Sequence, residues 1–246
     1  MFLLAVSNRI KFSAFVLIIG LILSRAGLAS TLEEIPIIAI DYPPFTIQGP
    51  DNDIVQDVEK FGLSFQHLEP ILNQHGYTAK PIFYPSARAN RVLRNRENWC
   101  FSFIPPSILQ PEFKQVILNR KPISFYFYRK KSPNLAPFKW QDLTELRGKT
   151  LAVLRVVYFS PLYQKIKDSN IILYSTENIA SAFKMLVKGR VSMVLADEVS
   201  AQYFNEMGII NLEELEHSEN TVYTVKSRFW LNTLCPKAEK LHELIK

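Results

Sequence analysis

The sequence is poor in residues that bind metal ions. It has only two cysteines, Cys100 and Cys235, and four histidines, which do not cluster along the chain. Neither cysteine belongs to a short Cys or His motif with the ligand spacing of a zinc site. We therefore predict no metal site and no cofactor.

Long apolar runs are also scarce. The run at residues 12–23 follows the bases Arg9 and Lys11 and has about a dozen residues, whereas a membrane-spanning helix needs roughly 20. Small residues precede position 30, as signal peptidase requires. We predict a secretory signal at residues 1–29, cleaved after Ala29, and a periplasmic location. An uncleaved membrane anchor is the alternative.

The chain has no strong excess of one charge. Its net charge is +6, and half of this leaves with the predicted signal, which holds three bases and no acid. The other bases are scattered, and the densest group, at residues 129–131, is typical of a solvated loop. We predict no nucleic-acid partner. Hydrophobic residues at 48% and charged residues at 21% are typical of a folded protein.

Apolar periodicity divides the rest of the chain into alternating strands and helices. The first cycle has predicted strands at 36–41, 79–85 and 99–104, and the second has strands at 149–157, 171–176 and 191–197, with helices between them. Strands that alternate with helices form parallel sheets covered on both faces. The predicted fold is therefore α/β, with two lobes that are each a mainly parallel sheet flanked by helices.

The connections between the cycles set the predicted lobe boundaries. Residues 116–130 form a long extended segment, and the tail is extended again from residue 220. We predict that the first lobe contains residues 30–118 plus 220–246, and that the second contains residues 119–219.

Four short motifs occur in an order that is typical of one protein family. They are DYPPF at 41–45, YPSARA at 84–89, DLTELRGKTLAVLR at 142–155 and AFKMLVKGRVSMVLAD at 182–197. With them the chain resembles the extracytoplasmic solute-binding proteins of the polar amino acid type, known as family 3. The resemblance implies a type II periplasmic-binding-protein fold, a ligand between the lobes, and work with an ABC permease or a sensor.

The cysteines fit a subgroup of this family. An exported chain with an even number of cysteines is compatible with one disulfide. The sequence looks most similar to members with one cysteine on the third strand and another near the C-terminus. This resemblance implies a Cys100–Cys235 disulfide and a tail that returns to the first lobe.

Candidate ligand contacts follow the first lobe's strands, because open α/β sheets bind ligands beyond the carboxyl ends of their strands. Tyr42 and Phe45 follow the first strand in a loop that Pro43 and Pro44 are expected to hold extended. Arg88 lies at a helix start, where an anionic ligand would explain its charge. The alternatives are rings that pack on their own lobe, and a surface ion pair for Arg88.

Three more candidates lie at strand ends of the second lobe. Arg155 and Tyr158 flank the end of the strand at 149–157, and Asp197 ends the strand at 191–197. In relatives an acid at this last position receives the ligand's amino group. The alternatives are a helix cap for Asp197, and ordinary surface and core positions for Arg155 and Tyr158.

The sequence departs from the family pattern where relatives hold their ligand. Phe113 replaces an Arg that usually clamps an α-carboxylate, and Val156 replaces a glycine. We expect an exported, monomeric, non-enzymatic protein that binds a small polar solute, amino-acid-like or otherwise charged, for uptake or sensing. One alternative is a dehydratase-like or glycan-active enzyme, for which Asp41 and Asp197 are the carboxylates to nominate. Another is an orphan protein with a degenerate site.

Overall fold

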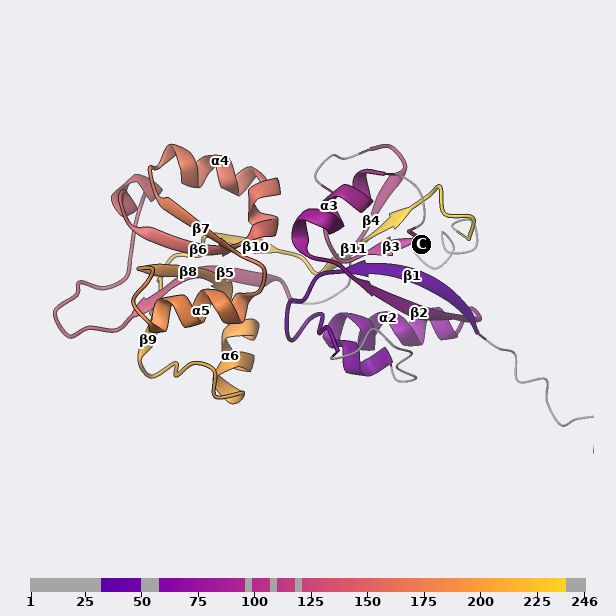
Figure 1. The fold of residues 1–246 in the computed structure, drawn as a ribbon, viewed down its shortest axis with the longest axis horizontal. Helices are drawn as coiled ribbons and strands as arrows, with labels where there is room; N and C mark the ends of the chain where they lie inside the picture. Colours follow the sequence, from indigo (N-terminus) through magenta and orange to yellow (C-terminus); the bar gives the residue numbers. More distant parts are fainter. Residues whose placement is uncertain (1–31, 50–57, 96–98, 107–109, 118–120, 238–246) are drawn as a thin grey trace, which may run out of the picture. The chain divides into compact units, whose positions relative to one another are not determined.

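A computed structural model describes residues 32–49, 58–95, 99–106, 110–117 and 121–237. The signal predicted at residues 1–29 and the end of the tail lie outside these ranges. The described chain forms two lobes, each built on its own sheet (Figure 1). None of the helices in these ranges has the length and the apolar character that a membrane crossing requires.

The first sheet has five strands in the order β2–β1–β3–β11–β4. β1 (Glu33–Ala39) is parallel to β3 (Phe101–Ser102), and β2 (Tyr77–Phe83) forms one edge. β11 (Arg228–Asn232) runs antiparallel to β3 and to β4 (Phe113–Ile117), which forms the other edge. The tail of the chain therefore completes the sheet that its beginning started.

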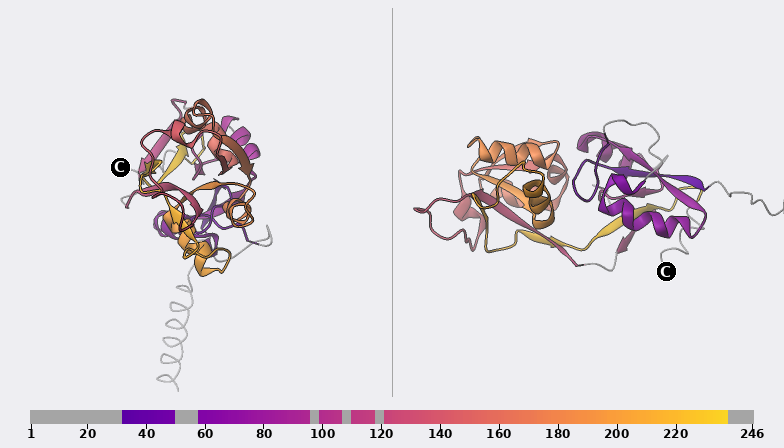
Figure 2. Two further views of the ribbon diagram at one scale, coloured as in Figure 1. Left: turned by 90° about the vertical axis from the view of Figure 1, so that its left-hand side faces the viewer. Right: turned by 90° about the horizontal axis from the view of Figure 1, so that it is seen from below.

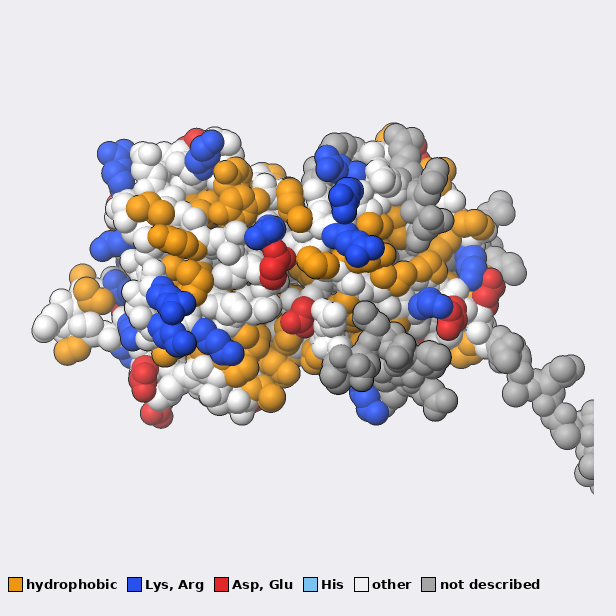
Figure 3. All heavy atoms as spheres, viewed as in Figure 1, with side chains coloured by type: hydrophobic (Ala, Val, Ile, Leu, Met, Phe, Trp, Pro, Cys, Tyr) orange, Lys and Arg blue, Asp and Glu red, His pale blue; other side chains and the backbone are white. Residues whose placement is uncertain are grey.

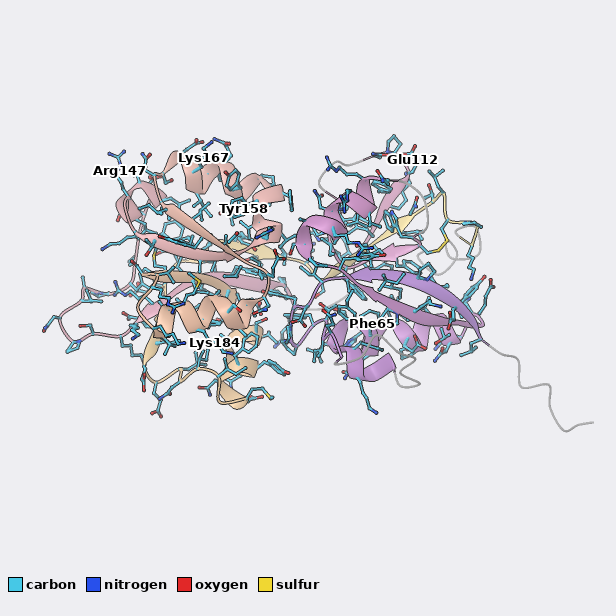
Figure 4. The ribbon with its side chains drawn as sticks, in the orientation of Figure 1. Phe65, Glu112, Arg147, Tyr158, Lys167 and Lys184 are labelled. Carbon is cyan, nitrogen blue, oxygen red and sulfur yellow. A yellow bond between two sulfur atoms is a disulfide. The ribbon has the colours of Figure 1, made fainter. Side chains whose placement is uncertain are left out.

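Helices cover both faces of this sheet because β1 alternates its apolar side chains with the strand period of two. Ile37 packs on the side of α2 (Leu63–Asn73), which follows the short helix η1 (Val58–Phe61) and buries Phe65 there (Figure 4). Ile38 packs on the other side, against α3 (Ser86–Arg94). Burying a side chain of this size contributes roughly 1.5–3 kcal/mol.

The second sheet has the order β10–β5–β8–β6–β7, with β9 paired to β5. β6 (Thr150–Leu154), β7 (Ile172–Thr176) and β8 (Met193–Asp197) are parallel neighbours. β5 (Ile123–Lys130) runs antiparallel to β8. β9 (Leu215–His217) and β10 (Tyr223–Val225) each run antiparallel to β5.

Helices also cover both faces of the second sheet. α5 (Ile179–Val187) and α6 (Glu198–Glu206) pack on one face, and α4 (Pro161–Asp168) packs on the other. A short helix, η2 (Leu143–Leu146), lies near α4 and begins with a capping box at Asp142. The α/β fold with two helix-flanked sheets is therefore confirmed.

One predicted strand is shorter than expected. The strand predicted at 149–157 ends at Leu154, and Arg155–Phe159 form the 3-10 helix η3 instead. The turn lets Val157 pack into the core beneath α4, while Val156 packs toward the α3 side of the first sheet. If β6 continued straight, both valines would lie beyond its end and lose these contacts. Burial of the two side chains therefore outweighs their preference for a strand.

The chain crosses between the sheets twice. It passes from β4 to β5 and returns from β10 to β11, and the right-hand view of Figure 2 shows the returning yellow stretch running from one lobe to the other. β5 enters the second lobe from the first and runs antiparallel to β8. β11 enters the first lobe from the second and runs antiparallel to β3. The predicted lobe boundaries stay a prediction, and we note that β10 pairs within the second sheet.

The predicted disulfide between Cys100 and Cys235 is confirmed. The two cysteines are 135 positions apart, and both are buried beside β3 and β11 in the first sheet. The bond therefore joins the tail to the first lobe and closes a loop that contains the whole second sheet.

Candidate functional site

A cavity of about 750 Å³ lies between the two sheets, and residues of both border it. Ile40 lies just beyond β1, Ile104 beyond β3 and Val156 beyond β6. These are the carboxyl ends of parallel strands, where ligands of open α/β sheets bind. The volume falls within the roughly 300–1,000 Å³ of ligand pockets.

Most of the cavity wall is apolar and aromatic. Phe125 stacks on Tyr223 with ring centroids 4.4 Å apart, and Tyr42 stacks on Phe45 at 5.8 Å. The aromatic lining residues are Tyr42, Phe45, Phe103, Phe125, Trp140, Tyr223 and Trp230. Such a wall binds apolar groups of a ligand by removing them from water.

The charged part of the lining is basic. Lys165 of α4 borders the cavity, as do Lys226 and Arg228 of the segment that returns to the first sheet. Within the described ranges the lining contains no Asp or Glu, and no ion pair neutralises these three cations. His67 also lines the cavity, and its Nδ1 is hydrogen-bonded to the carbonyl of Leu63.

Tyr42 and Phe45, two of the predicted contacts, border the cavity. Their loop is a tight turn rather than the extended segment expected from its prolines, and the Pro43–Pro44 peptide is cis. The Tyr42 N–H donates to the Thr46 carbonyl at 2.8 Å, which folds the loop back on itself. Their role in ligand binding stays a prediction.

The loop is attached to the start of α2. The N–H groups of Leu63 and Ser64 donate to the carbonyls of Pro44 and Phe45 at 2.9 and 2.8 Å. Gly62 makes this approach feasible, because it has a φ of 100° and a Cβ there would lie 2.6 Å from the Pro44 oxygen. The fixed loop holds both rings at the cavity.

Asp197 is fully buried and is the N-cap of α6. Its Oδ1 accepts from the Ser200 N–H at 2.9 Å, and its Oδ2 accepts from the hydroxyl of Tyr42 in the other lobe. The Ser200 hydroxyl in turn donates to the Pro43 carbonyl at 2.9 Å. We call these three contacts the clasp: the Tyr42 and Pro43 contacts join the two lobes, and the Ser200 N–H holds Asp197 in place. The geometry agrees with the helix-cap alternative for Asp197.

The electrostatics of the clasp follow from its burial. Burial raises the pKa of the Asp197 carboxyl above its ordinary value, against the lowering effect of its hydrogen bonds. Burial and then the charge of Asp197 raise the pKa of Tyr42 well above its usual range. Asp197 is not among the residues that border the cavity. A ligand ammonium group would have to displace the Tyr42 hydroxyl to reach it.

The remaining predicted contacts lie outside the cavity lining. Arg155 Nε lies 2.9 Å from Glu177 Oε1, and Glu177 Oε2 accepts from the Ser86 N–H at 3.4 Å, at the start of α3. Arg88 lies over the ring of Tyr84 at 4.8 Å. Glu177, the partner of Arg155, therefore brings a carboxylate of the protein itself to the start of α3.

Tyr158 also has a partner within its own lobe. Its ring stacks on Tyr163 of α4 with centroids 4.8 Å apart, and Figure 4 shows it beside that helix. A ligand role for Tyr158, Arg88, Arg155 and Asp197 stays a prediction.

Sequence reasoning missed two features of this region, namely the Glu177 contact and the basic lining. Lys226 and Arg228 belong to an extended stretch with no motif, so no local pattern marked them. Their place in a crossing segment was the available signal, because crossing segments border the space between the lobes.

No protein-family model matches the sequence, and neither does any curated protein. Solved structures do match. The arginine-bound form of truncated ArgBP from T. maritima has a TM-score of 0.61 and 16% identity, and the match covers 87% of this chain and 98% of that chain. An arginine 3rd transport system periplasmic binding protein from Legionella pneumophila gives 0.62 and 16%, with 87% and 90% covered.

A third match is the GluR0 ligand-binding core from Nostoc punctiforme in complex with L-glutamate. Its TM-score is 0.60 at 13% identity, and the match covers 86% of this chain and 91% of that chain. Identities this low establish the fold alone. This chain therefore has the two-lobed fold that these amino-acid-bound and periplasmic binding proteins share.

Proposed function

We propose that this chain is an exported binding protein that holds a small solute between its two lobes. The observation that carries the proposal is the cavity of about 750 Å³ at the carboxyl ends of β1, β3 and β6, bordered by residues of both sheets. A solute there contacts both lobes at once. Its binding energy then favours the arrangement in which they meet.

The two crossing segments support a hinge between the lobes. Domains joined by short extended strands close over ligands by rotation of a few connecting residues. Contacts such as the clasp form only when the lobes meet, so they add to the stability of a closed complex. We retain Tyr42 and Phe45 as ligand contacts within this proposal.

The comparisons suggest how such binding is used. One of the matched structures is a periplasmic binding protein of a transport system, and others hold arginine or glutamate. We propose by analogy a periplasmic, monomeric receptor that delivers its solute to an inner-membrane ABC permease or a sensor.

The geometry gives less support to the alternative of an enzyme. Asp197 is buried in the clasp, and Asp41 accepts a hydrogen bond from the Gln48 N–H at 3.1 Å. Neither of these two nominated carboxylates borders the cavity. General acid–base catalysis needs such groups within hydrogen-bonding reach of the substrate.

Calorimetry on the purified protein tests the proposal directly. A panel of amino acids, amines and small organic acids should contain a ligand that binds saturably, and small-angle scattering should show a more compact protein when it is bound. Phe45→Ala should weaken this binding. Tyr174→Ala, which removes an exposed aromatic ring outside the cavity, is the matched control. If no panel member binds or compacts the protein, the proposal is wrong.

A further inference from the structure

We infer that the ligand of this cavity is an organic anion with an apolar body, such as an aromatic or branched carboxylic acid, rather than an amino acid. The inference rests on the proposed binding function and specifies its ligand class. Two properties support it, namely the charge of the lining, and an apolar wall beside an acid that is already occupied.

The first property is the charge of the lining. Lys165, Lys226 and Arg228 border the cavity from two different segments, and no carboxylate within the described ranges borders it with them. On the face shown in Figure 3, acidic side chains lie beside basic ones at several places on both lobes. Like charges gathered around one space attract an anion and repel a cation.

The second property begins with Asp197, the acid that contacts the lining residue Tyr42. An α-amino group needs a carboxylate or other acceptor, and both oxygens of Asp197 are already bonded by Ser200 and Tyr42. Burying an ammonium group without a partner is costly. The aromatic wall around Phe125 and Tyr223 meanwhile favours an apolar body. An acid without an amino group therefore fits better than the matching amino acid.

The test compares ligands that differ only in charge. For each of three bodies, phenyl, indolyl and isobutyl, calorimetry measures the carboxylic acid, the α-amino acid and the amine, for example 3-phenylpropionate, L-phenylalanine and 2-phenylethylamine. We expect the best acid to bind at least about tenfold more tightly than its amino acid, with the amine weakest. The affinity for the acid should fall as salt is added.

The outcomes separate this inference from the proposed function. If amino acids bind as tightly as the acids or more tightly, the anion assignment is wrong and the binding function stands. If neither these ligands nor the wider panel bind, both are wrong.

Variants then test whether the basic lining is responsible. The triple variant Lys165→Gln, Lys226→Gln and Arg228→Gln should lose the preference for the acid over the amino acid. Lys167→Gln is the matched control, because Lys167 is on α4 with Lys165 but does not border the cavity and lies on the outer side of the helix (Figure 4).

Circular dichroism establishes that each variant is folded before its binding is measured. If the triple variant does not fold, the exposed Lys226→Gln change alone should still weaken binding of the acid about tenfold. A folded variant that retains the full preference for the acid contradicts the assignment.

Discussion

The buried carboxylate of Asp197 allows the clasp to be tested by its effect on stability. Asp197→Ala removes the N-cap of α6, which costs about 0.5–2 kcal/mol, and it leaves the Tyr42 hydroxyl without its acceptor, which costs about 1–3 kcal/mol. The free energy of unfolding should therefore fall by about 1.5–5 kcal/mol. Asp197→Asn retains an acceptor for the Ser200 N–H and a polar partner for Tyr42, so it should cost less.

The pH dependence of the same variants has a definite sign. Burial raises the pKa of Asp197 above its ordinary value of 3.8, so the folded state binds its proton more tightly than the unfolded state does. The stability that this shift contributes is fully present below the unfolded pKa, and it is lost as the pH rises through the folded pKa. Asp197→Asn has no such loss, so its stability relative to the wild type should improve as the pH rises from 3.8 through that range.

The assay is urea unfolding followed by tryptophan fluorescence and by circular dichroism. Coincident transitions by the two probes justify a two-state treatment of a protein with two lobes. If Asp197→Ala changes the free energy of unfolding by less than about 0.5 kcal/mol, the size of an ordinary surface substitution, the clasp does not contribute as the structure indicates.

Three further changes test other parts of the fold. Replacing Cys100 and Cys235 by Ala opens a loop of 135 residues, and loop entropy gives a loss of about 5 kcal/mol, measured by urea unfolding; an unchanged midpoint would contradict this. Gly62→Ala should cost about 1–3 kcal/mol more in unfolding free energy than Gly189→Ala, because both glycines have a positive φ but only Gly62 lies against backbone. Glu177→Gln should change the free energy of unfolding by less than about 1 kcal/mol, because its ion pair with Arg155 is half exposed. Calorimetry should show that ligand affinity changes by less than about tenfold. A larger gain in affinity would mean that the freed Arg155 binds the ligand.

Much of the fold could be predicted from the sequence, because the burial of one face of a strand or helix gives its apolar residues a regular spacing. The alternation on β1 and the apolar face of α5 marked a strand and a helix, and order along the chain then implied two sheets. The turn at Arg155–Phe159 could not be predicted in this way, because its valines have high β-propensity and only the packing of α4 and α3 decides their direction.

The candidate site was predictable only in part, for a different reason. Tyr42 and Phe45 could be predicted because residues that follow the carboxyl end of a strand lie where open α/β sheets bind ligands, and both border the cavity. Asp197 could not be assigned from sequence, since a helix cap and a ligand contact place a carboxylate at the same point of the chain. The basic lining depends on Lys226 and Arg228, whose position follows from the crossing topology rather than from a local pattern.

The clasp and the basic lining should affect binding in different ways, and this difference provides a last prediction. The Tyr42 hydroxyl joins the lobes whatever ligand is bound, so Tyr42→Phe removes a contact that favours closure while it retains the ring at the cavity. The lost hydrogen bond is worth about 0.5–1.5 kcal/mol, or about two- to thirteenfold in Kd.

Calorimetry of Tyr42→Phe should therefore show every ligand weakened by a similar factor, whether acid or amino acid. Lys226→Gln should instead weaken the acids more than the amino acids, because its charge attracts the carboxylate of both but also repels the ammonium group of an amino acid. If Tyr42→Phe weakened only one class of ligand, the hydroxyl would contact the ligand itself. The clasp would then open when the ligand binds, and closure would depend on the ligand instead.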